Sequence, residues 1–224
     1  MQTSKPPLSP AERLAKYLRD ANDYWFHVYK PHVGDVIVDV GAGRGEDVYA
    51  FSRAVGAEGR VWAIEAHPES FAKLTKFCEE QRLGNVTCLN LACLDRPGQF
   101  QIETLPVWES NYVREGEPAE TSFPVEGITF DALCRRHNIG RIDFLKMNIE
   151  GAERFALPGM KEAMKRVQNA CVCAHDFRAD RGEGEEFRTR AFVEQFLREA
   201  GFTLVSRDDD PRYYVPYHIH GRRE

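Results

Sequence analysis

Short apolar runs alternate along this chain with segments in which apolar side chains recur every three or four positions. Val36, Ile37, Val38 and Val40 form a β-branched run without polar alternation, which is typical of a parallel strand buried on both faces. A helical pattern follows shortly afterwards, and the same order then repeats. The other predicted strands of this kind are 59–65, 86–92, 142–148 and 170–176. The predicted helices are 10–28, 48–55, 68–81, 130–137, 160–167 and 185–200.

The two ends of the chain carry further signals. Residues 1–9 are polar and proline-rich, so we expect a flexible tail that ends at Ser9, a favourable helix N-cap. The aromatic side of helix 10–28 either packs against the edge of the sheet or covers a ligand cleft. Near the other end, 202–206 and 212–219 are expected to pair as an antiparallel hairpin. The pattern predicts an α/β fold whose open, mostly parallel sheet has an antiparallel edge and helices on both faces.

The regular alternation stops between the third and fourth of these strands. Residues 99–105 alternate like an exposed strand, and residues 106–124 are rich in Pro, Glu, Gly and Ser, which is typical of a loop on the binding face. We expect this loop to contact a substrate, and the alternative is an ordered surface loop without a ligand role. Its candidate substrate-binding residues are Trp108, Ser110, Asn111 and Tyr112.

A glycine-rich turn follows the first strand. Gly41, Gly43 and Gly45 suit a turn that needs positive φ and lets a ligand approach the backbone, and the next helix offers free N–H groups. A dinucleotide-binding turn has the pattern G-x-G-x-x-G, but Glu46 stands where its third glycine belongs. The acids Asp39 and Glu46 disfavour phosphate and favour a cationic ligand without phosphate. S-adenosylmethionine (SAM) is such a ligand.

An acidic residue also ends the second predicted strand. Glu65 stands 20 positions after Gly45, where a carboxylate accepts hydrogen bonds from both ribose hydroxyls of a bound nucleoside. Enzymes that bind nicotinamide dinucleotides have the same feature, so Glu65 alone does not separate the two cofactors. Together with Asp39 and the missing third glycine, it favours SAM.

Length and charge limit the partners. The chain has 224 residues, and we expect one domain spanning 1–224. Its net charge of −5 gives no general attraction to nucleic acid or to an anionic membrane, and no apolar run approaches membrane-spanning length. The N-terminus lacks a signal-like apolar segment, so we expect a cytoplasmic protein. We expect its partner to be a small molecule, and the sequence does not determine the oligomeric state. The six cysteines show no paired C-x-x-C spacing, which predicts neither a zinc site nor a disulfide framework.

Four segments together resemble the FkbM-type methyltransferases: VDVGAGRGEDV, IEAHPESF, LNLACLD and DFLKMNIEGAE. The resemblance covers roughly residues 34–176. It implies a class I, Rossmann-like fold with a seven-stranded sheet of order 3-2-1-4-5-7-6. It also implies SAM-dependent methyl transfer, mostly to hydroxyl groups of small polar metabolites such as sugars or secondary metabolites.

The resemblance also implies which residues hold the cofactor. Glu65 would hold the ribose, and Ala92 with Cys93 would lie near the adenine. Ala42 and Ala66 are further cofactor-binding candidates beside them. The residues around the methionine part of SAM would be Asp39, Gly41, Gly43 and Gly45.

Polar residues follow the fourth and fifth predicted strands, at the edge where such sheets bind ligands. A hydroxyl nucleophile must lose a proton, so its methylation needs a general base or a metal ion. His175 is the candidate base because imidazole titrates near neutral pH, and the alternative is a structural or substrate-orienting histidine. The candidate catalytic residues are Asn148, Glu150, His175 and Asp176. The side-chain oxygens of Asn148, Glu150 and Asp176 are also of the type that Mg²⁺ accepts, although the sequence favours a metal-free site.

The residue at position 148 leaves the type of reaction undetermined. The segment in the resembled family usually reads Lys-x-Asp-x-Glu-Gly, and Asn148 here replaces the aspartate while Glu150 is intact. An amide does not accept a proton, although it still orients a ligand. The alternatives are therefore an N-methyltransferase, whose acceptor nitrogen needs less help from a base, and a SAM-binding partner protein without chemistry of its own. A nicotinamide-dependent oxidoreductase is disfavoured by Glu46.

Overall fold

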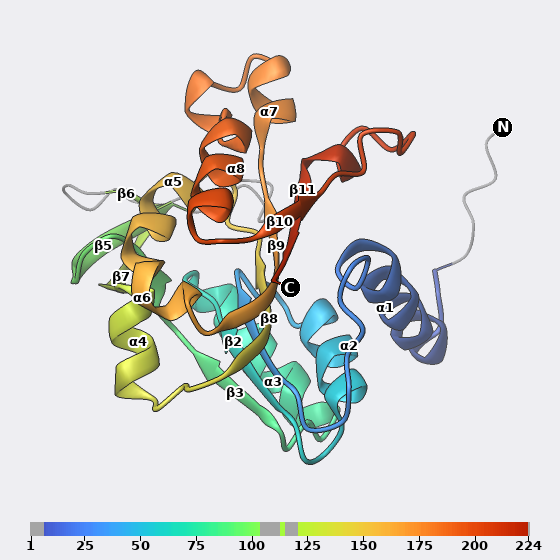
Figure 1. The fold of residues 1–224 in the computed structure, drawn as a ribbon. Helices are drawn as coiled ribbons and strands as arrows, with labels where there is room; N and C mark the ends of the chain where they lie inside the picture. The colour runs from blue at the N-terminus through green and yellow to red at the C-terminus, as the bar shows by residue number, and fades with distance from the viewer. Residues whose placement is uncertain (1–6, 104–112, 115–120, 224) are drawn as a thin grey trace, which may run out of the picture.

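The computed structural model describes residues 7–103, 113–114 and 121–223, which form an α/β fold around a seven-stranded sheet (Figure 1). The strands of this sheet are β1 (Val36–Val40), β2 (Arg60–Ile64), β3 (Val86–Leu89), β8 (Ile142–Met147), β9 (Val167–Cys173), β10 (Thr203–Val205) and β11 (His218–Arg222). Their order is β10-β11-β9-β8-β1-β2-β3. Only β11 runs antiparallel to its neighbours β9 and β10. The predicted fold class, sheet order and antiparallel edge are confirmed.

Helices cover both faces of the sheet (Figure 1). On one face lie α1 (Pro10–Tyr24), α2 (Glu46–Val55) and α3 (Pro68–Glu80). On the other lie α4 (Phe130–Arg136), α5 (Glu153–Ala156), α6 (Lys161–Met164) and α8 (Arg190–Glu199). A short helix, α7 (Asp176–Asp180), follows β9 directly. Three 3₁₀ turns complete the described helices: η2 (Leu157–Met160), η3 (Glu185–Phe187) and η4 (Val215–Tyr217).

The core has two layers because successive side chains of a strand point to opposite faces. Ile37 of β1 and Phe144 of β8 belong to the layer with Phe51 of α2. Val38 and Leu145, the next residue of each strand, belong to the layer under α4, α6 and α8. The central strands are therefore buried on both faces, as their continuous apolar runs predict.

The strand register places three turns side by side. Val40 at the end of β1 pairs with Ile64 at the end of β2 and with Met147 at the end of β8. Gly41, Glu65 and Asn148 are the next residues of these strands. The carboxyl edge of the sheet thus gathers residues from three distant parts of the sequence.

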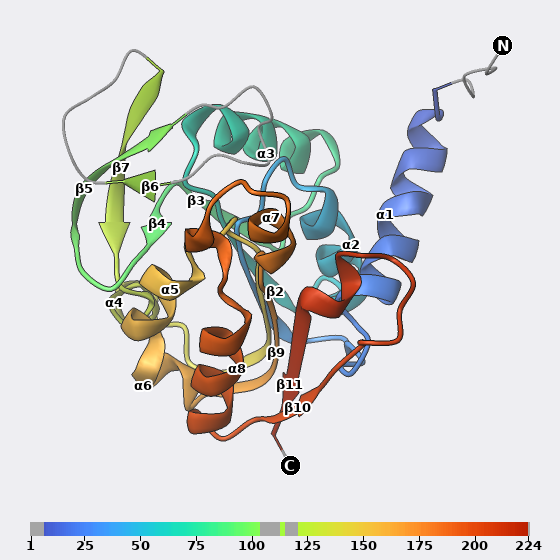
Figure 2. The ribbon, with the colours of Figure 1, turned by 90° about the horizontal axis from the view of Figure 1, so that it is seen from above.

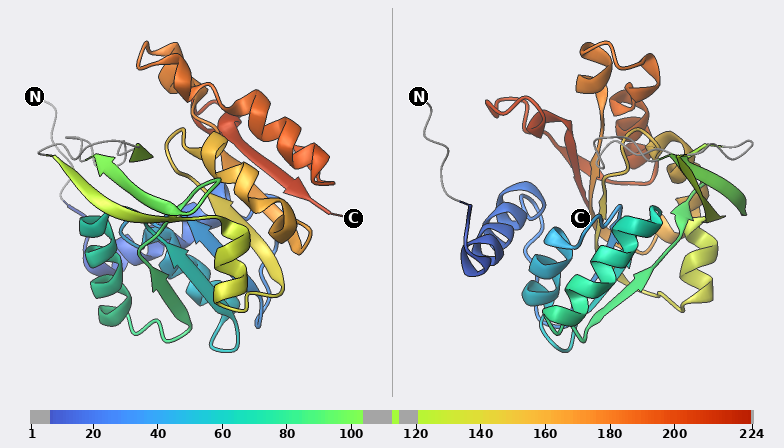
Figure 3. Two further views of the ribbon diagram at one scale, coloured as in Figure 1. Left: turned by 90° about the vertical axis from the view of Figure 1, so that its left-hand side faces the viewer. Right: turned by 180° about the vertical axis from the view of Figure 1, so that it is seen from behind.

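A second, smaller sheet departs from the predicted alternation. Its strands are β4 (Ala92–Cys93), β5 (Gly98–Glu103), β6 (Val113–Arg114) and β7 (Ser122–Ile128), in the order β4-β7-β5-β6. Figure 3 shows this sheet, in green, beside the main one. The predicted strand 86–92 is therefore two strands in different sheets, and the predicted loop 106–124 contains β6 and the start of β7. Trp108, Ser110, Asn111 and Tyr112 lie outside the described residues.

Several predicted element ends are wrong, and tertiary packing explains them. Helix α1 begins after Ser9 as predicted but ends at Tyr24, because the chain turns there to bury Trp25 and Phe26. It packs on α2 (Figure 1), and its last residue, Tyr24, also contacts His218 of β11 near the antiparallel edge of the sheet. The predicted helix 160–167 ends at Met164, and β9 already starts at Val167. The predicted strand 212–219 begins only at residue 218, after η4.

Candidate functional site

An open cavity of about 830 Å³ lies at the carboxyl edge of the main sheet. It is lined by the turns after β1, β2 and β8, by the end of β9 with α7, and by part of the segment between β10 and β11. Figure 2 looks onto this edge from above. Open α/β sheets bind their ligands at this edge, and the volume is that of a cofactor or small-molecule site.

The glycine turn forms one wall of the cavity. At Gly41 φ is +83°, and a Cβ there would lie 2.1 Å from the backbone oxygen of Asn148, so only glycine fits against the end of β8. Gly43 has φ of +57°, and its N–H donates a hydrogen bond to Oε2 of Glu65 at 2.8 Å. Gly45 is needed for helix packing, because a Cβ at this position would lie 2.9 Å from the ring of Phe77 in α3. It permits α2 to pack on α3 and is not among the described residues that line the cavity.

Glu65 lines the cavity at the end of β2. Its Oε2 accepts the hydrogen bond from Gly43, and its Oε1 accepts one of 2.8 Å from the N–H of His67. Each oxygen keeps a second lone pair for a ligand. Burial raises the pKa of Glu65 above its ordinary value, while the backbone N–H groups of His67 and Gly43 oppose the shift by favouring the carboxylate.

Four small residues predicted to bind the cofactor also line this cavity, namely Ala42, Ala66, Ala92 and Cys93. The side-chain amide of Asn90 donates hydrogen bonds to the carbonyl oxygens of Glu65 and Ala66, at 2.8 and 2.9 Å. These bonds fix the turn after β2 against the end of β3. The structure thus brings most of the predicted cofactor residues to one place.

Asp39 is placed otherwise than the sequence suggested. Its side chain is fully buried and is not among the described residues that line the cavity. Its Oδ1 lies 2.9 Å from Nζ of Lys146, which also donates to the carbonyl oxygen of Gly41 at 2.9 Å. Burial raises the pKa of Asp39 to about 7, partly offset by Lys146. Burial also works against the charged form of Lys146, but Asp39 and Asp47 outweigh it and raise the pKa of Lys146. The acid of the motif is therefore held by a buried lysine that itself lines the cavity.

A second cluster lies at the ends of β8 and β9. Nε2 of His175 lies 3.1 Å from Oδ1 of Asn148 and 3.4 Å from Oε1 of Glu150. Nδ1 of His175 lies 3.2 Å from Oε1 of Glu153. The other carboxylate oxygen of Glu150 accepts a hydrogen bond of 3.0 Å from Arg178. The structure confirms that the ends of these two strands converge, as the topology predicts.

The surroundings of His175 decide its charge. Burial disfavours the imidazolium, but the carboxylates of Glu153 and Glu150 outweigh burial and hold the pKa of His175 well above its ordinary value. Both ring nitrogens of an imidazolium are donors. The three oxygen acceptors around the ring therefore favour the imidazolium, which does not act as a proton acceptor.

The backbone at Glu150 is in the left-handed region, with φ of +57°. This conformation costs a residue other than glycine about 1 kcal/mol, and such strain concentrates at functional sites. The pairs with His175 and Arg178 hold the Glu150 side chain at the cavity, where it is 21% exposed.

Asp176 occupies a structural position. Its Oδ2 accepts hydrogen bonds of 2.9 Å from the N–H groups of both Thr189 and Arg190, at the start of α8. It is not among the described residues that line the cavity. These bonds also explain why the predicted helix 185–200 is divided into η3 and α8. Asp176 thus fastens α8 beneath the site.

Sequence reasoning missed several residues of the site. Lys146 carried a signal, since a lysine within an apolar strand needs a buried partner. Glu153 carried a weaker one, as an acid next to the Glu150 motif. Arg178 and Arg181 line the cavity from α7, a helix that the sequence pattern did not predict.

Two further observations limit what is present in the described part of the chain. No group of three or more His, Cys, Asp or Glu side chains is placed there to hold a metal ion. None of its helices is both long and apolar enough to cross a membrane.

Comparisons with known proteins point to one family. A family model described as Methyltransferase FkbM domain matches residues 39–204 of this chain. Hexuronic acid methyltransferase AglP of Haloferax volcanii is 25% identical over 176 residues, which cover 79% of this chain and 68% of that protein.

Solved structures share the fold. Methyltransferase FkbM from Methylobacillus flagellatus superposes with a TM-score of 0.58 at 15% identity, covering 89% of this chain and 46% of that one. This chain thus spans less than half the length of that structure. Aeropyrum pernix fibrillarin, in complex with natively bound S-adenosyl-L-methionine, superposes with a TM-score of 0.53 at 13% identity, covering 93% of this chain and 75% of that chain.

Proposed function

This chain belongs to the FkbM methyltransferase family, and we propose that it transfers a methyl group from SAM to an oxygen of a small, polar, sugar-like acceptor. The observation that carries the proposal is the position of Glu65. Its carboxylate lines the cavity, is held by two backbone N–H groups and keeps lone pairs for further donors.

The residues around Glu65 fit SAM. Gly41 and Gly43 line the cavity, where the methionine part of SAM would lie against their backbone, and Glu65 would accept hydrogen bonds from the ribose hydroxyls. Ala66, Ala92 and Cys93 would form the apolar wall for the adenine. When bound, SAM supplies an electrophilic methyl group on a positively charged sulfur. The chain's own contribution is to hold the cofactor and to align the acceptor with it.

The cluster at the ends of β8 and β9 would receive the acceptor. We assign proton acceptance from an acceptor hydroxyl to Glu150, which lines the cavity and keeps carboxylate lone pairs beside its two cationic partners. His175 as imidazolium would position Glu150 and Asn148 and would not act as the base. The Asn148 amide would orient the acceptor. Asp176 supports the site from α8 and is not assigned a chemical role.

The relative AglP supports the sugar-like acceptor. AglP is named for hexuronic acid as its acceptor, and it aligns with 79% of this chain. A hexuronic acid offers both hydroxyl and carboxylate oxygens.

The positive charge of His175 favours a second candidate function, methyl transfer without a general base, because an imidazolium does not accept a proton. If Glu150 does not act as a base, the acceptor must be a nucleophile that needs no deprotonation, such as an amine nitrogen or a carboxylate oxygen. Methyl transfer would then depend mainly on alignment. The dependence of turnover on Glu150 separates the two candidates, because Glu150→Gln would leave transfer to such a nucleophile largely unchanged.

SAM binding tests the proposal at Glu65. Glu65→Ala is expected to weaken SAM binding by about 2–3 kcal/mol, because hydrogen bonds to a charged acceptor are lost. Isothermal titration calorimetry measures the change. Glu69→Ala, an exposed acid in the first turn of α3, is the matched control and should bind SAM like the parent. Equal affinity of a folded Glu65→Ala variant would remove Glu65 from the site.

Transfer itself is measured with methyl-labelled SAM and a panel of free sugars and sugar acids. Labelled product, with release of S-adenosylhomocysteine, is the expected result. A protein that binds SAM but labels no member of a broad acceptor panel would instead match the non-catalytic alternative.

A further inference from the structure

Arg181 differs from the other cation that α7 brings to the cavity. It follows the last residue of α7, lines the cavity and is exposed. No ion pair or side-chain hydrogen bond of Arg181 is found within residues 7–103, 113–114 and 121–223. Arg178, by contrast, is buried and paired with both Glu150 and Glu183. Because Glu183 forms its ion pair with Arg178, the guanidinium of Arg181 remains available to a bound ligand.

Two aromatic rings hold the Arg181 guanidinium. Its Cζ lies 4.4 Å from the ring centroid of Tyr213 and 5.5 Å from that of Phe177. Contact with the ring faces uses none of the conventional hydrogen bonds of the guanidinium, so its N–H groups stay available to bind a carboxylate with two parallel hydrogen bonds. Among the described residues no such partner is present.

The same rings connect Arg181 with the predicted chemistry. The ring centroid of Phe177 lies 5.8 Å from that of Tyr213 and 5.8 Å from the imidazole of His175. The ring of Phe177 therefore separates Arg181 from His175, which belongs to the cluster with Asn148 and Glu150. A molecule that spans this distance contacts both the cluster and the guanidinium.

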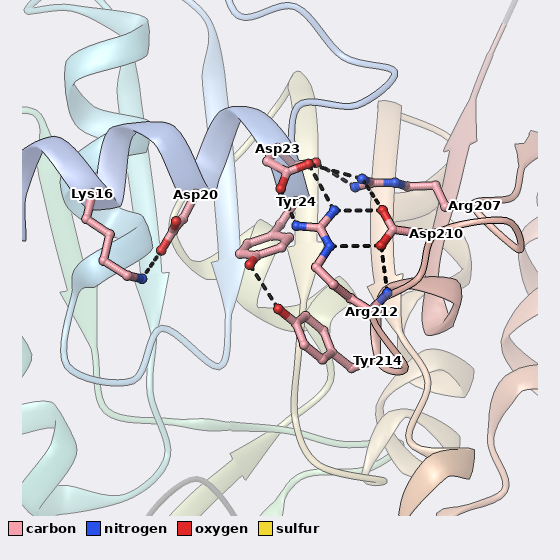
Figure 4. Close-up of polar contacts among 8 residues, drawn as sticks. All are labelled: Lys16, Asp20, Asp23, Tyr24, Arg207, Asp210, Arg212 and Tyr214. Atoms are coloured by element: carbon pink, nitrogen blue, oxygen red, sulfur yellow. Dashed lines mark hydrogen bonds and ion pairs between the residues drawn. The ribbon is translucent and has the colours of Figure 1, made fainter. Parts of the chain in front are cut away.

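The residues on either side of Tyr213, Arg212 and Tyr214, form hydrogen bonds that hold this part of the chain in place. Figure 4 shows Arg212 between the carboxylates of Asp23 in α1 and Asp210, with Tyr214 against Tyr24. Nη2 of Arg212 lies 2.7 Å from Oδ2 of Asp210, and the two tyrosine hydroxyl oxygens lie 2.9 Å apart. Residues on both sides of Tyr213 are thus tied to other elements, which presents its ring to Arg181.

The charges of the cavity are also divided between its ends. At the end that holds the glycine turn, the acids Glu46, Asp47 and Glu65 outnumber the one lysine, Lys146, which suits the cationic sulfonium and amino groups of SAM. The end at α7 contributes the acids Glu150 and Glu183, which are both paired with Arg178, and in addition Arg181, which has no acidic partner among the described residues. An acidic acceptor would be repelled at the first end and attracted at the second, so the separation favours one orientation in the cavity.

We propose that Arg181, which lies against the rings of Tyr213 and Phe177, is the specificity residue that binds a carboxylate of the acceptor. The proposal rests on the methyltransferase function above and names its substrate class, a sugar acid. Arg181 holds the acidic group of the acceptor and thereby leaves the reacting oxygen beside Glu150.

Binding to a matched set of sugars tests the proposal without requiring turnover. The protein is first saturated with S-adenosylhomocysteine and then titrated with D-glucuronate, D-glucose or D-glucose 6-phosphate at one ionic strength, followed by NMR chemical shifts. D-glucuronate is expected to bind at least about tenfold more tightly than D-glucose, because a charge-assisted bidentate pair forms only with the acid. Arg181→Gln should abolish the preference, and Arg181→Lys should keep only part of it, because lysine lacks the planar fork.

Arg154→Gln is the matched control. Arg154 is also an exposed arginine over a ring, with its Cζ 4.7 Å from the centroid of Phe155, but it is not among the described residues that line the cavity. This variant should keep the full preference for D-glucuronate. Both variants should bind S-adenosylhomocysteine like the parent, which shows that they are folded.

The outcomes separate the two proposals. A parent protein that binds neither SAM nor S-adenosylhomocysteine would overturn the proposed function. A parent that binds S-adenosylhomocysteine but shows no preference for D-glucuronate, including no binding of any sugar, would overturn only the role of Arg181. Tighter binding of the phosphate than of the carboxylate, or an unchanged preference in Arg181→Gln, would also overturn that role.

Discussion

Nδ1 of His175 lies 3.2 Å from Oε1 of Glu153, and neither side chain is more than 3% exposed. The pair joins the end of β9 to the first residue of α5. On the other side of the ring, Asn148 and Glu150 complete a set of three oxygen acceptors around one imidazole. This arrangement stabilises the protonated form, and the pKa of His175 lies well above its ordinary value for that reason.

The charge of His175 predicts a pH-dependent stability. Because the folded pKa is raised above the unfolded value of about 6.5, the stabilisation is fully present below that pH and is lost as pH rises through the folded pKa. His175→Gln should lower the free energy of unfolding by about 3–5 kcal/mol in acid, since Glu153 is left buried without its cation. It should also remove the decline toward alkaline pH. Urea unfolding at about pH 6 and about pH 9 measures both effects.

His32→Gln is the control for this experiment, because the His32 side chain is 79% exposed. Its unfolding free energy should stay within about 0.5 kcal/mol of the parent at each pH. A His175→Gln variant with the same pH profile as the parent would show that His175 is neutral in the folded protein. The imidazole would then again be a candidate base.

Local sequence patterns were enough to predict most of the residues that line the cavity around the glycine turn. Each signal lies within a few residues of its consequence: the apolar run of β1 determines a buried strand, and the glycines after it determine the turn. Glu65 was found because its place is the end of a strand. These features depend on periodicity and on backbone geometry, which a single sequence displays.

Contacts between distant residues account for what the sequence did not predict. Helix 185–200 was expected to be continuous, but Asp176 accepts hydrogen bonds from Thr189 and Arg190 and starts a separate helix there. The charge of His175 depends on Glu153 in another element. The binding of Lys146 to Asp39 depends on the register of β8 against β1, which aligns these two residues. Periodicity contains no information about such pairs.

Asn148→Asp tests the neighbourhood of the imidazole. A carboxylate at this position would add a second negative charge beside Nε2 of His175 and a third around the imidazole, so the pKa of His175 should rise further. NMR titration of the imidazole measures this shift, and the affinity for SAM should stay within about threefold. Asn22→Asp, an exposed change in α1, should leave the pKa of His175 unchanged. A lowered pKa in Asn148→Asp would mean that the side chain at this position turns away from His175.

Lys146→Met tests the buried ion pair. Removing the ammonium leaves Asp39 without its partner in the core, and the free energy of unfolding should fall by about 3–5 kcal/mol. The double variant Asp39→Asn/Lys146→Met should be less destabilised than the sum of the single variants, because no charge then remains unpaired. Lys165→Met, which removes an exposed lysine paired with Glu162, should change stability by less than about 1 kcal/mol. Additive losses in the double variant would contradict the coupling.

Asp23→Asn tests whether α1 holds the segment that carries Tyr213. The carboxylate of Asp23 binds both Arg207 and Arg212 (Figure 4), and the hydrogen bond from Arg212 is the main reason that the pKa of Asp23 is lowered. The Asp23 side chain is 45% exposed, so the variant should lose no more than about 1 kcal/mol of global stability. Amide hydrogen exchange should nevertheless become faster across residues 207–214, because local opening there no longer breaks the contacts with α1.

Asp20→Asn provides the comparison within the same helix. Asp20 lies one turn before Asp23 and pairs with Lys16, away from the arginines (Figure 4). It should leave exchange in residues 207–214 unchanged. If Arg181 depends on a fixed Tyr213 ring, Asp23→Asn should also weaken the preference for D-glucuronate while SAM affinity stays at the parent value. Faster exchange in Asp23→Asn without any loss of that preference would mean that Arg181 binds the acceptor without support from Tyr213.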